Sequence, residues 1–97
     1  MQALEQEGIA LQVLGTVHAS RGETAGALGA LERSREILRG TSERQELART
    51  LAALARAYRA LPPGDARRSE ADQLVAEAVA IFRELGAELD LLRLAPD

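Results

Sequence analysis

The sequence lacks cysteine and lysine, and it has almost no aromatic residues. Without cysteine the chain cannot form disulfide bridges, thiolate zinc sites or a catalytic thiol. Because all twelve basic residues are arginine, a Walker-type phosphate loop and Schiff-base catalysis, which both need lysine, are excluded as well. With one Phe, one Tyr and no Trp, any hydrophobic core has to be built from aliphatic side chains and alanine.

The composition that remains is typical of helices, since Ala, Leu, Arg and Glu together account for 58 of the 97 residues. The chain is 46% hydrophobic and 28% charged, which predicts one folded all-α domain over residues 1–97 rather than a disordered segment. Its first residues carry no export signal, and no apolar run approaches the roughly 20 residues that a bilayer requires. We therefore expect a cytoplasmic protein without membrane contact.

Helix-breaking glycines and one Pro-Pro-Gly-Asp loop at residues 62–65 divide the chain. They separate four predicted helices over residues 4–20, 24–39, 41–61 and 66–85. A short apolar segment follows, and we expect it to form a C-terminal capping helix within residues 87–97.

Hydrophobic spacing predicts which side of each helix faces the core. In the third helix one apolar stripe repeats at spacings of four and three residues: Leu47, Leu51, Leu54, Tyr58 and Leu61. In the first helix we expect Leu11 and Leu14 to face the core together with the only histidine, His18. The second helix contains Gly26 and Gly29, and we interpret these small residues as a site of close packing against another helix.

An internal repeat links the two halves of the chain. Leu11-x2-Leu14-Gly15-x2-His18 in the first half matches Leu51-x2-Leu54-Ala55-x2-Tyr58 forty residues later. Ala27-x3-Leu31 likewise matches Ala71-x3-Val75 forty-four residues later, and the four extra residues are the Pro-Pro-Gly-Asp loop. The pattern resembles the tetratricopeptide repeat family, in which a large residue, Leu-Gly, Tyr and a later Ala recur at these spacings.

The resemblance implies two tandem antiparallel helix–turn–helix repeats, over residues 4–40 and 41–86, that act as a non-catalytic scaffold for protein–protein interaction. The chain departs from the family pattern at Leu11, where Trp is usual, at His18, where Tyr is usual, and at Ala55, where Gly is usual. Residues 80–86 are similar to repeats appended to large bacterial signalling or regulatory proteins, so we expect a fragment of such a protein. The alternative is an ordinary four-helix bundle whose repeat pattern is fortuitous.

In tetratricopeptide arrays the first helix of each repeat lines a concave groove that holds an extended peptide. By this register the resemblance implies a ligand groove lined by Gln12, Thr16, Arg49, Arg56 and Arg59. Arginines flanked by alanine can receive a carboxylate through two parallel hydrogen bonds, so the expected partner is an acidic or C-terminal peptide segment. The alternative is that these arginines are solvated or pair with Glu5 or Glu7 of the adjacent helix.

The first helix carries a second apolar stripe, formed by Ile9, Val13 and Val17 at a spacing of four residues. In a repeat array this stripe would meet a preceding repeat, which the sequence does not contain. We therefore expect these residues to form a self-association face that pairs two copies as a homodimer. This leaves open an alternative function, in which the chain is a purely structural dimerisation segment and recruits no other protein.

No motif for catalysis or cofactor binding is found. His18 has no second histidine and no cysteine with which to share a metal ion, so we expect a packed structural residue. Ser20 lies on another side of the helix from His18 and lacks an oriented carboxylate, and the carboxylates of the second helix are surrounded by arginines. The net charge of −3 and the absence of clustered aromatics argue against direct nucleic-acid binding. The sequence thus predicts no enzyme activity, no cofactor and no metal.

Overall fold

The computed structural model describes residues 3–86, Asp90 and Leu92. This part of the chain is helical and contains no strand, so the expected all-α fold is confirmed. Its elements are α1 (Ala3–Ser20), α2 (Thr24–Arg39), α3 (Arg44–Arg59), the 3-10 helix η1 (Ala66–Glu70) and α4 (Ala71–Leu85). The capping helix expected within residues 87–97 lies outside the described residues, except at Asp90 and Leu92.

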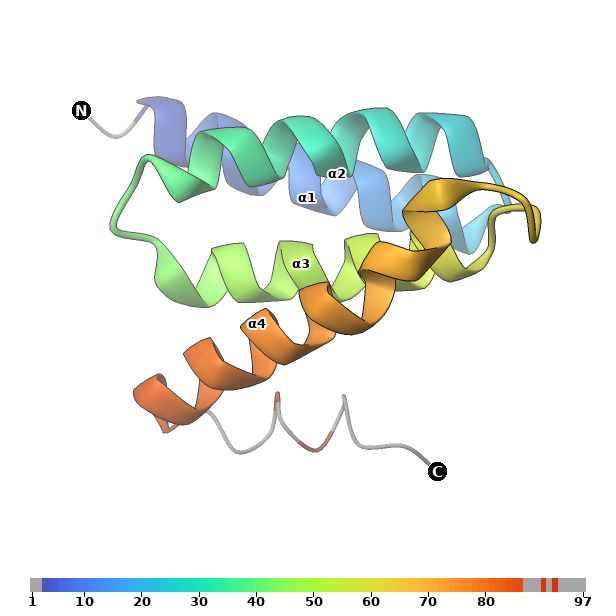
Figure 1. Cartoon of the computed structure of the whole chain (residues 1–97). Helices are drawn as coiled ribbons and strands as arrows, with labels where there is room; N and C mark the ends of the chain where they lie inside the picture. Colours follow the sequence, from blue (N-terminus) through green and yellow to red (C-terminus); the bar gives the residue numbers. More distant parts are fainter. Residues whose placement is uncertain (1–2, 87–89, 91, 93–97) are drawn as a thin grey trace.

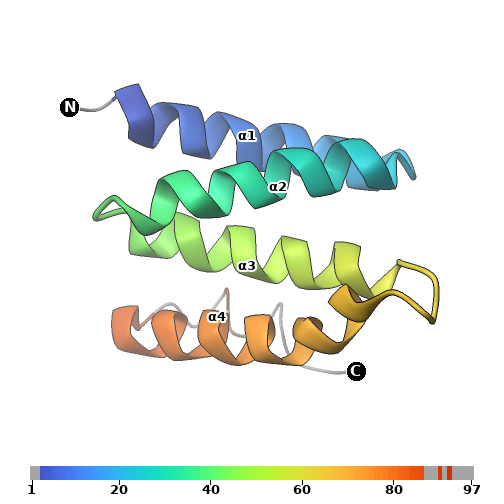
Figure 2. The ribbon, with the colours of Figure 1, turned by 45° about the horizontal axis from the view of Figure 1, so that its top comes forward.

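The four α-helices lie side by side in chain order, each antiparallel to the next (Figure 1, Figure 2). α1 packs on α2, α2 on α3 and α3 on α4, with a smaller contact between α1 and α3. Short connections favour this order, because a helix that begins a few residues after another folds back along it. Gly22 makes the tight turn before α2, and its φ of 74° is a left-handed conformation that glycine adopts without steric cost.

The core is centred on α3, whose predicted apolar stripe is confirmed. No residue of the stripe from Leu47 to Leu61 is more than 7% exposed. The large core residues contributed by α2 and α4 are Leu28, Leu31, Leu38, Leu74, Ile81 and Phe82. α3 is therefore the helix against which both of its neighbours bury their apolar sides.

α1 packs differently from the prediction. The expectation that Leu11 and Leu14 both face the core is wrong for Leu14, which is 47% exposed, and Leu11 is half-buried. The buried residues of α1 are instead Gly8 and Gly15. Residues seven apart lie on the same side of an α-helix, so α1 turns a strip of bare backbone toward α2.

The two glycines allow α1 to approach α2 closely. A Cβ atom on Gly15 would lie 2.5 Å from Cγ of Leu31, and a Cβ atom on Gly8 would lie 2.8 Å from Cγ of Leu38. Carbon atoms in contact prefer about 3.5–4.0 Å. The leucines of α2 therefore fill the space that a side chain of α1 would need.

The glycines of α2 do not bring a second helix close. Gly29 has no atom within 4 Å of its Cβ position, so the interpretation of this residue as a close-packing site is wrong. Gly26 lies against the ring of His18, which is 3.1 Å from its Cβ position. Gly26 thus makes room for one side chain, whereas the close approach of the helices is made by the glycines of α1.

We expect alanine substitutions at Gly15 and Gly29 to have opposite effects on stability. Gly15→Ala should lower the free energy of unfolding by about 1–2 kcal/mol, because overpacking against Leu31 outweighs the gain in helix propensity. Gly29→Ala should raise it by about 0.5–1 kcal/mol, since the added methyl group meets no other atom and alanine loses less backbone entropy. Urea denaturation followed by circular dichroism measures both changes. Equal stabilisation by the two substitutions would contradict the close approach of α1 to α2.

A buried chain of hydrogen bonds joins α1, α2 and α3. The hydroxyl of Ser34 donates to the main-chain oxygen of Gly8 over 2.7 Å and lies 3.1 Å from the hydroxyl of Thr50. Ser34 and Thr50 are fully buried, and no buried side-chain polar atom among the described residues lacks a hydrogen-bond partner. Because a buried hydroxyl without a partner costs free energy, these bonds favour one relative position of the three helices.

Tyr58 makes a further polar link between α3 and α2. Its ring is buried, and its hydroxyl donates to the carboxylate of Glu32 over 2.7 Å. Burial and this hydrogen bond together raise the pKa of Tyr58 from 10.0 to about 12. The folded protein therefore holds the phenolic proton more tightly than the unfolded chain does.

Stability should consequently fall as the pH rises from 10.0 to about 12. Below this range Tyr58 is protonated in both the folded and the unfolded state, and its contribution to the free energy of unfolding is fully present. Above the range this contribution is lost. Because the chain has one tyrosine and no tryptophan, an alkaline titration of tyrosinate absorbance reports this pKa directly. Glu32→Gln should lower the midpoint. A wild-type midpoint at the ordinary value of 10.0 would contradict the buried hydrogen bond.

Candidate functional site

A groove runs between α1 and α3. Its first part is a hollow of about 160 Å³, lined by Gln12, Thr16, Arg49, Ala52, Ala53, Arg56, Phe82 and Asp90. Its second part is a larger hollow of about 370 Å³, lined by Thr16, Ala19, Ser20, Thr24, Ala27, Arg56, Ala57 and Ala60. Thr16 and Arg56 line both hollows, so the two lie next to each other, and we call them together the α1–α3 groove.

Four of the five residues predicted for a ligand groove line the α1–α3 groove. Gln12 and Thr16 come from α1, and Arg49 and Arg56 come from α3. The two pairs are far apart in the sequence and meet because α3 passes beside α1. Arg59 is not among the lining residues.

Gln12 and Thr16, the two groove residues of α1 predicted from the sequence, both make hydrogen bonds within the fold. The side-chain amide of Gln12 donates to the main-chain oxygen of Glu46 over 2.9 Å, and its nitrogen lies 3.2 Å from the hydroxyl oxygen of Thr50. The hydroxyl of Thr16 donates to the main-chain oxygen of Gln12, also over 2.9 Å. The bonds of Gln12 tie α1 to α3, whereas the bond of Thr16 stays within α1.

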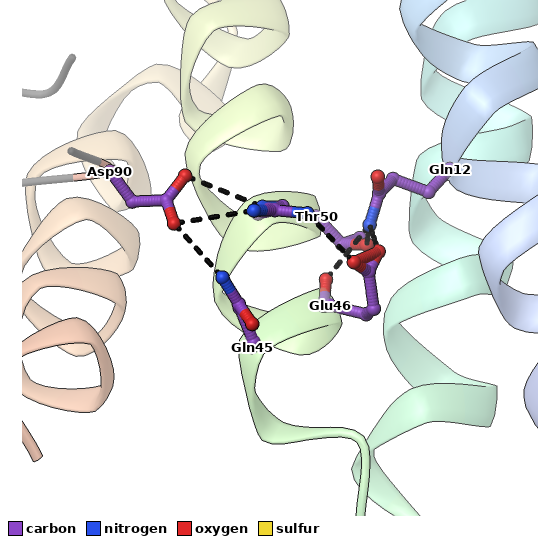
Figure 3. A network of polar contacts seen from close by, with 6 residues as sticks. Gln12, Gln45, Glu46, Thr50 and Asp90 are labelled. Atoms are coloured by element: carbon purple, nitrogen blue, oxygen red, sulfur yellow. Dashed lines mark hydrogen bonds and ion pairs between the residues drawn. The ribbon is translucent and has the colours of Figure 1, made fainter. Parts of the chain in front are cut away.

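Arg49 already binds two carboxylates of the chain itself. Its guanidinium lies 2.9 Å from the carboxylate of Glu46 and 3.3 Å from that of Asp90. Gln45 donates a further hydrogen bond to Asp90 over 3.1 Å (Figure 3). The hydrogen bond with Asp90 raises the pKa of Arg49 above its ordinary value, with partial burial opposing the shift. One end of the groove therefore holds a carboxylate from the residues that follow α4.

The positive charge of Arg56 is available to a ligand. Within the part of the chain that the structure describes, its side chain is exposed and makes no hydrogen bond or ion pair. Its neighbours in the groove include Ala52, Ala53 and Ala60, whose short side chains leave the guanidinium uncovered. A carboxylate from outside the chain can therefore approach Arg56 without displacing an internal partner.

Arg59 is paired outside the groove. Its guanidinium lies 2.8 Å from the carboxylate of Asp72 in α4, and both side chains are at least half exposed. An exposed pair of this kind contributes about 0–1 kcal/mol to stability. The predicted strip of three groove arginines is thus reduced to Arg49 and Arg56. Pairing of the arginines with Glu5 or Glu7 is not found among the interactions of the described residues.

Sequence reasoning missed Asp90 and Phe82 as groove residues. No spacing rule connects Asp90 with Arg49, which precedes it by 41 positions. Phe82 follows the apolar period of α4 and is 1% exposed, yet it also lines the first hollow. The four groove residues that the sequence did predict follow from the register of its internal repeat, which pairs the first helices of the two halves.

The described residues contain no group of three or more His, Asp or Glu side chains that could hold a metal ion. His18 is half-buried at the end of α1, with its Nδ1 atom 2.9 Å from the carboxylate of Glu23. In the same part of the chain, no helix combines the length and the apolar character needed to cross a membrane. The chemistry that the groove supports is the capture of an anionic group by arginine.

Only two of the three residues expected to form a self-association face are exposed. Val13 and Val17 are 56% and 41% exposed, whereas Ile9 is half-buried and packs against the core. Leu14, rather than Ile9, is the third large apolar side chain exposed in the middle of α1. An apolar surface is therefore present, but it is rotated around the helix relative to the expectation.

Comparisons with known proteins find no matching family model, no similar curated protein and no similar solved structure. The resemblance to the tetratricopeptide repeat family therefore stays a prediction.

Proposed function

We propose that the chain is a non-catalytic scaffold for protein–protein interaction, and that its α1–α3 groove binds an acidic or C-terminal segment of a partner protein. The observation that carries this proposal is Arg56, which has no internal partner among the described residues and lies in a groove lined by alanine. Because Arg56 makes no hydrogen bond or ion pair within that part of the fold, its charge is available to a ligand.

The pairing of Arg49 with Asp90 supports the same binding chemistry. A carboxylate fits against α3 at this point, where Arg49 and Gln45 hold it. Arg56 lies seven residues further along the same side of α3, which is about 10 Å along the helix axis. An extended peptide covers this distance with about three residues. A ligand carboxylate at Arg56 therefore leaves room for small neutral residues beside Asp90.

The contacts in the groove favour binding over catalysis. A hydroxyl nucleophile needs an adjacent general base. Among the described groove residues, the hydroxyl of Thr16 bonds only to the main-chain oxygen of Gln12. The hydroxyl of Ser20 likewise donates to a main-chain oxygen, that of Val17, and the carboxylate of Asp90 is held by Arg49 and Gln45. Most of the remaining lining is arginine and alanine with one phenylalanine, which suits the recognition of a peptide rather than the activation of a reacting bond.

The helix arrangement supports a tetratricopeptide-like origin for this scaffold. α1–α2 and α3–α4 are consecutive antiparallel pairs (Figure 2). The α1–α3 groove lies between the first helices of the two pairs. On this proposal residues 4–40 and 41–86 are two repeats from a larger bacterial signalling or regulatory protein. The absence of cysteine fits the reducing cytoplasm as its location.

Arg56→Ala should weaken the binding of an acidic peptide by about ten- to a hundredfold, because a hydrogen bond to a charged group is worth roughly 1.5–3 kcal/mol. Affinity should also fall as salt is added, since charges in an open groove are screened within about 10 Å at 0.1 M ionic strength. The measurement is an array of acidic, neutral and basic peptides read at two ionic strengths, followed by fluorescence anisotropy with the best acidic peptide.

Arg33→Ala is the matched control, because it removes the same charge from an exposed residue of α2 outside the groove. This variant should bind the acidic peptide as the wild type does, and circular dichroism should show that both variants stay helical. Peptides that bind equally well at both ionic strengths, and equally to wild type and Arg56→Ala, would contradict the proposed groove function.

Self-association is a second candidate function, and the exposed side of α1 favours it. Val13, Leu14 and Val17 are large apolar residues at exposed positions of α1. The surface helices of monomeric proteins usually carry polar residues at such positions. If the groove binds no peptide, the chain would be a structural dimerisation segment. The oligomeric state of the chain across a range of concentrations tests this candidate.

A further inference from the structure

The exposed side of α1 is apolar in its middle and charged at both ends. We define the outer patch as four exposed apolar residues in the middle of this side, Ala10, Val13, Leu14 and Val17. Glu7 precedes the patch by one helical turn, and Arg21 follows it by one turn, directly after the end of α1. Both charged residues are exposed, and neither side chain has a hydrogen bond or ion pair within the described residues.

We propose that a second copy of this chain covers the outer patch, with the two α1 helices packed antiparallel about a two-fold axis between Val13 and Leu14. This inference rests on self-association, the second candidate function, and specifies its geometry. Burying the patch on itself removes the same apolar side chains of both copies from water, as in other isologous interfaces.

The positions of the two charges select the antiparallel arrangement. At 1.5 Å per residue, Glu7 lies about 10 Å from the centre of the outer patch on one side, and Arg21 lies about 11 Å from it on the other. The two-fold axis therefore places Glu7 of one copy opposite Arg21 of the second copy, and this pairing occurs twice. A parallel arrangement would instead set like charges opposite each other at both ends, which is unfavourable.

The dimer formed in this way is weak and leaves both grooves open. α1 has 18 residues and is therefore about 27 Å long. One side of a helix of this length buries less than the roughly 800 Å² per partner of a standard interface. We therefore expect half of the chains to be dimeric at a concentration between micromolar and millimolar. Gln12 and Thr16 point to a different side of α1 from Leu14, so the dimer presents two grooves to a partner.

Reversal of the two charges tests the geometry. Glu7→Arg and Arg21→Glu should each weaken self-association by about tenfold, because each variant alone places two like-charged pairs in its dimer. An equimolar mixture of the two variants should associate at least as strongly as the wild type, since every pair in the mixed dimer is again of opposite charge. Sedimentation velocity of the full chain from micromolar to millimolar concentration compares the wild type, both variants and the mixture.

Two further variants serve as controls, and circular dichroism verifies the helix content of each. Val13→Glu would bury a charge at the centre of the patch, so it should stay monomeric throughout the concentration range. Arg83→Glu makes the same charge reversal at an exposed residue of α4, and it should associate like the wild type.

Self-association and its antiparallel geometry are contradicted by different results. A wild-type chain that stays monomeric at millimolar concentration would overturn self-association itself. A wild-type dimer that the single charge reversals leave unchanged, or that their mixture fails to restore, would overturn the antiparallel geometry alone.

Discussion

The close approach of α1 to α2 at two glycines is the constraint on which the groove depends. A side chain at Gly15 would collide with Leu31, and one at Gly8 would collide with Leu38. From the position that these glycines allow, Gln12 reaches the main chain of α3 and bonds to it. A larger residue at either glycine would push α1 outward, and the groove would lose the wall that faces α3.

The same constraint explains why α1 presents large apolar side chains to the surroundings. Most surface helices bury their large residues and expose their polar ones. α1 buries glycine, so Val13, Leu14 and Val17 lie on the outside. The helix therefore has three distinct sides: bare backbone toward α2, polar residues toward the groove, and an apolar surface suited to a second copy. One helix thus connects the two binding functions that we propose.

Properties that depend on neighbouring residues could be predicted from the sequence, and long-range contacts could not. The helices and the stripe of α3 follow from helix breakers and a local period, and the matching halves of the chain bring four predicted groove residues together. By contrast, the sequence does not show what a glycine within a helix contacts. Gly15 lies against a leucine, whereas Gly29 faces open space. The pairing of Arg49 with Asp90 likewise has no periodic signature, so only the folded chain reveals that one groove arginine is occupied and Arg56 is not.

The central claim, that the groove receives a carboxylate at Arg56, is tested most directly by mapping a bound peptide onto the chain. Amide chemical shifts of the isotope-labelled protein would be followed during titration with the best acidic peptide from the array. We expect the largest changes around Thr16 and Ala19 in α1, around Ala53 in α3 and around Ala60 directly after α3, because these residues line the groove together with Arg56. Changes confined to the outer patch, or spread evenly over all four helices, would contradict this claim.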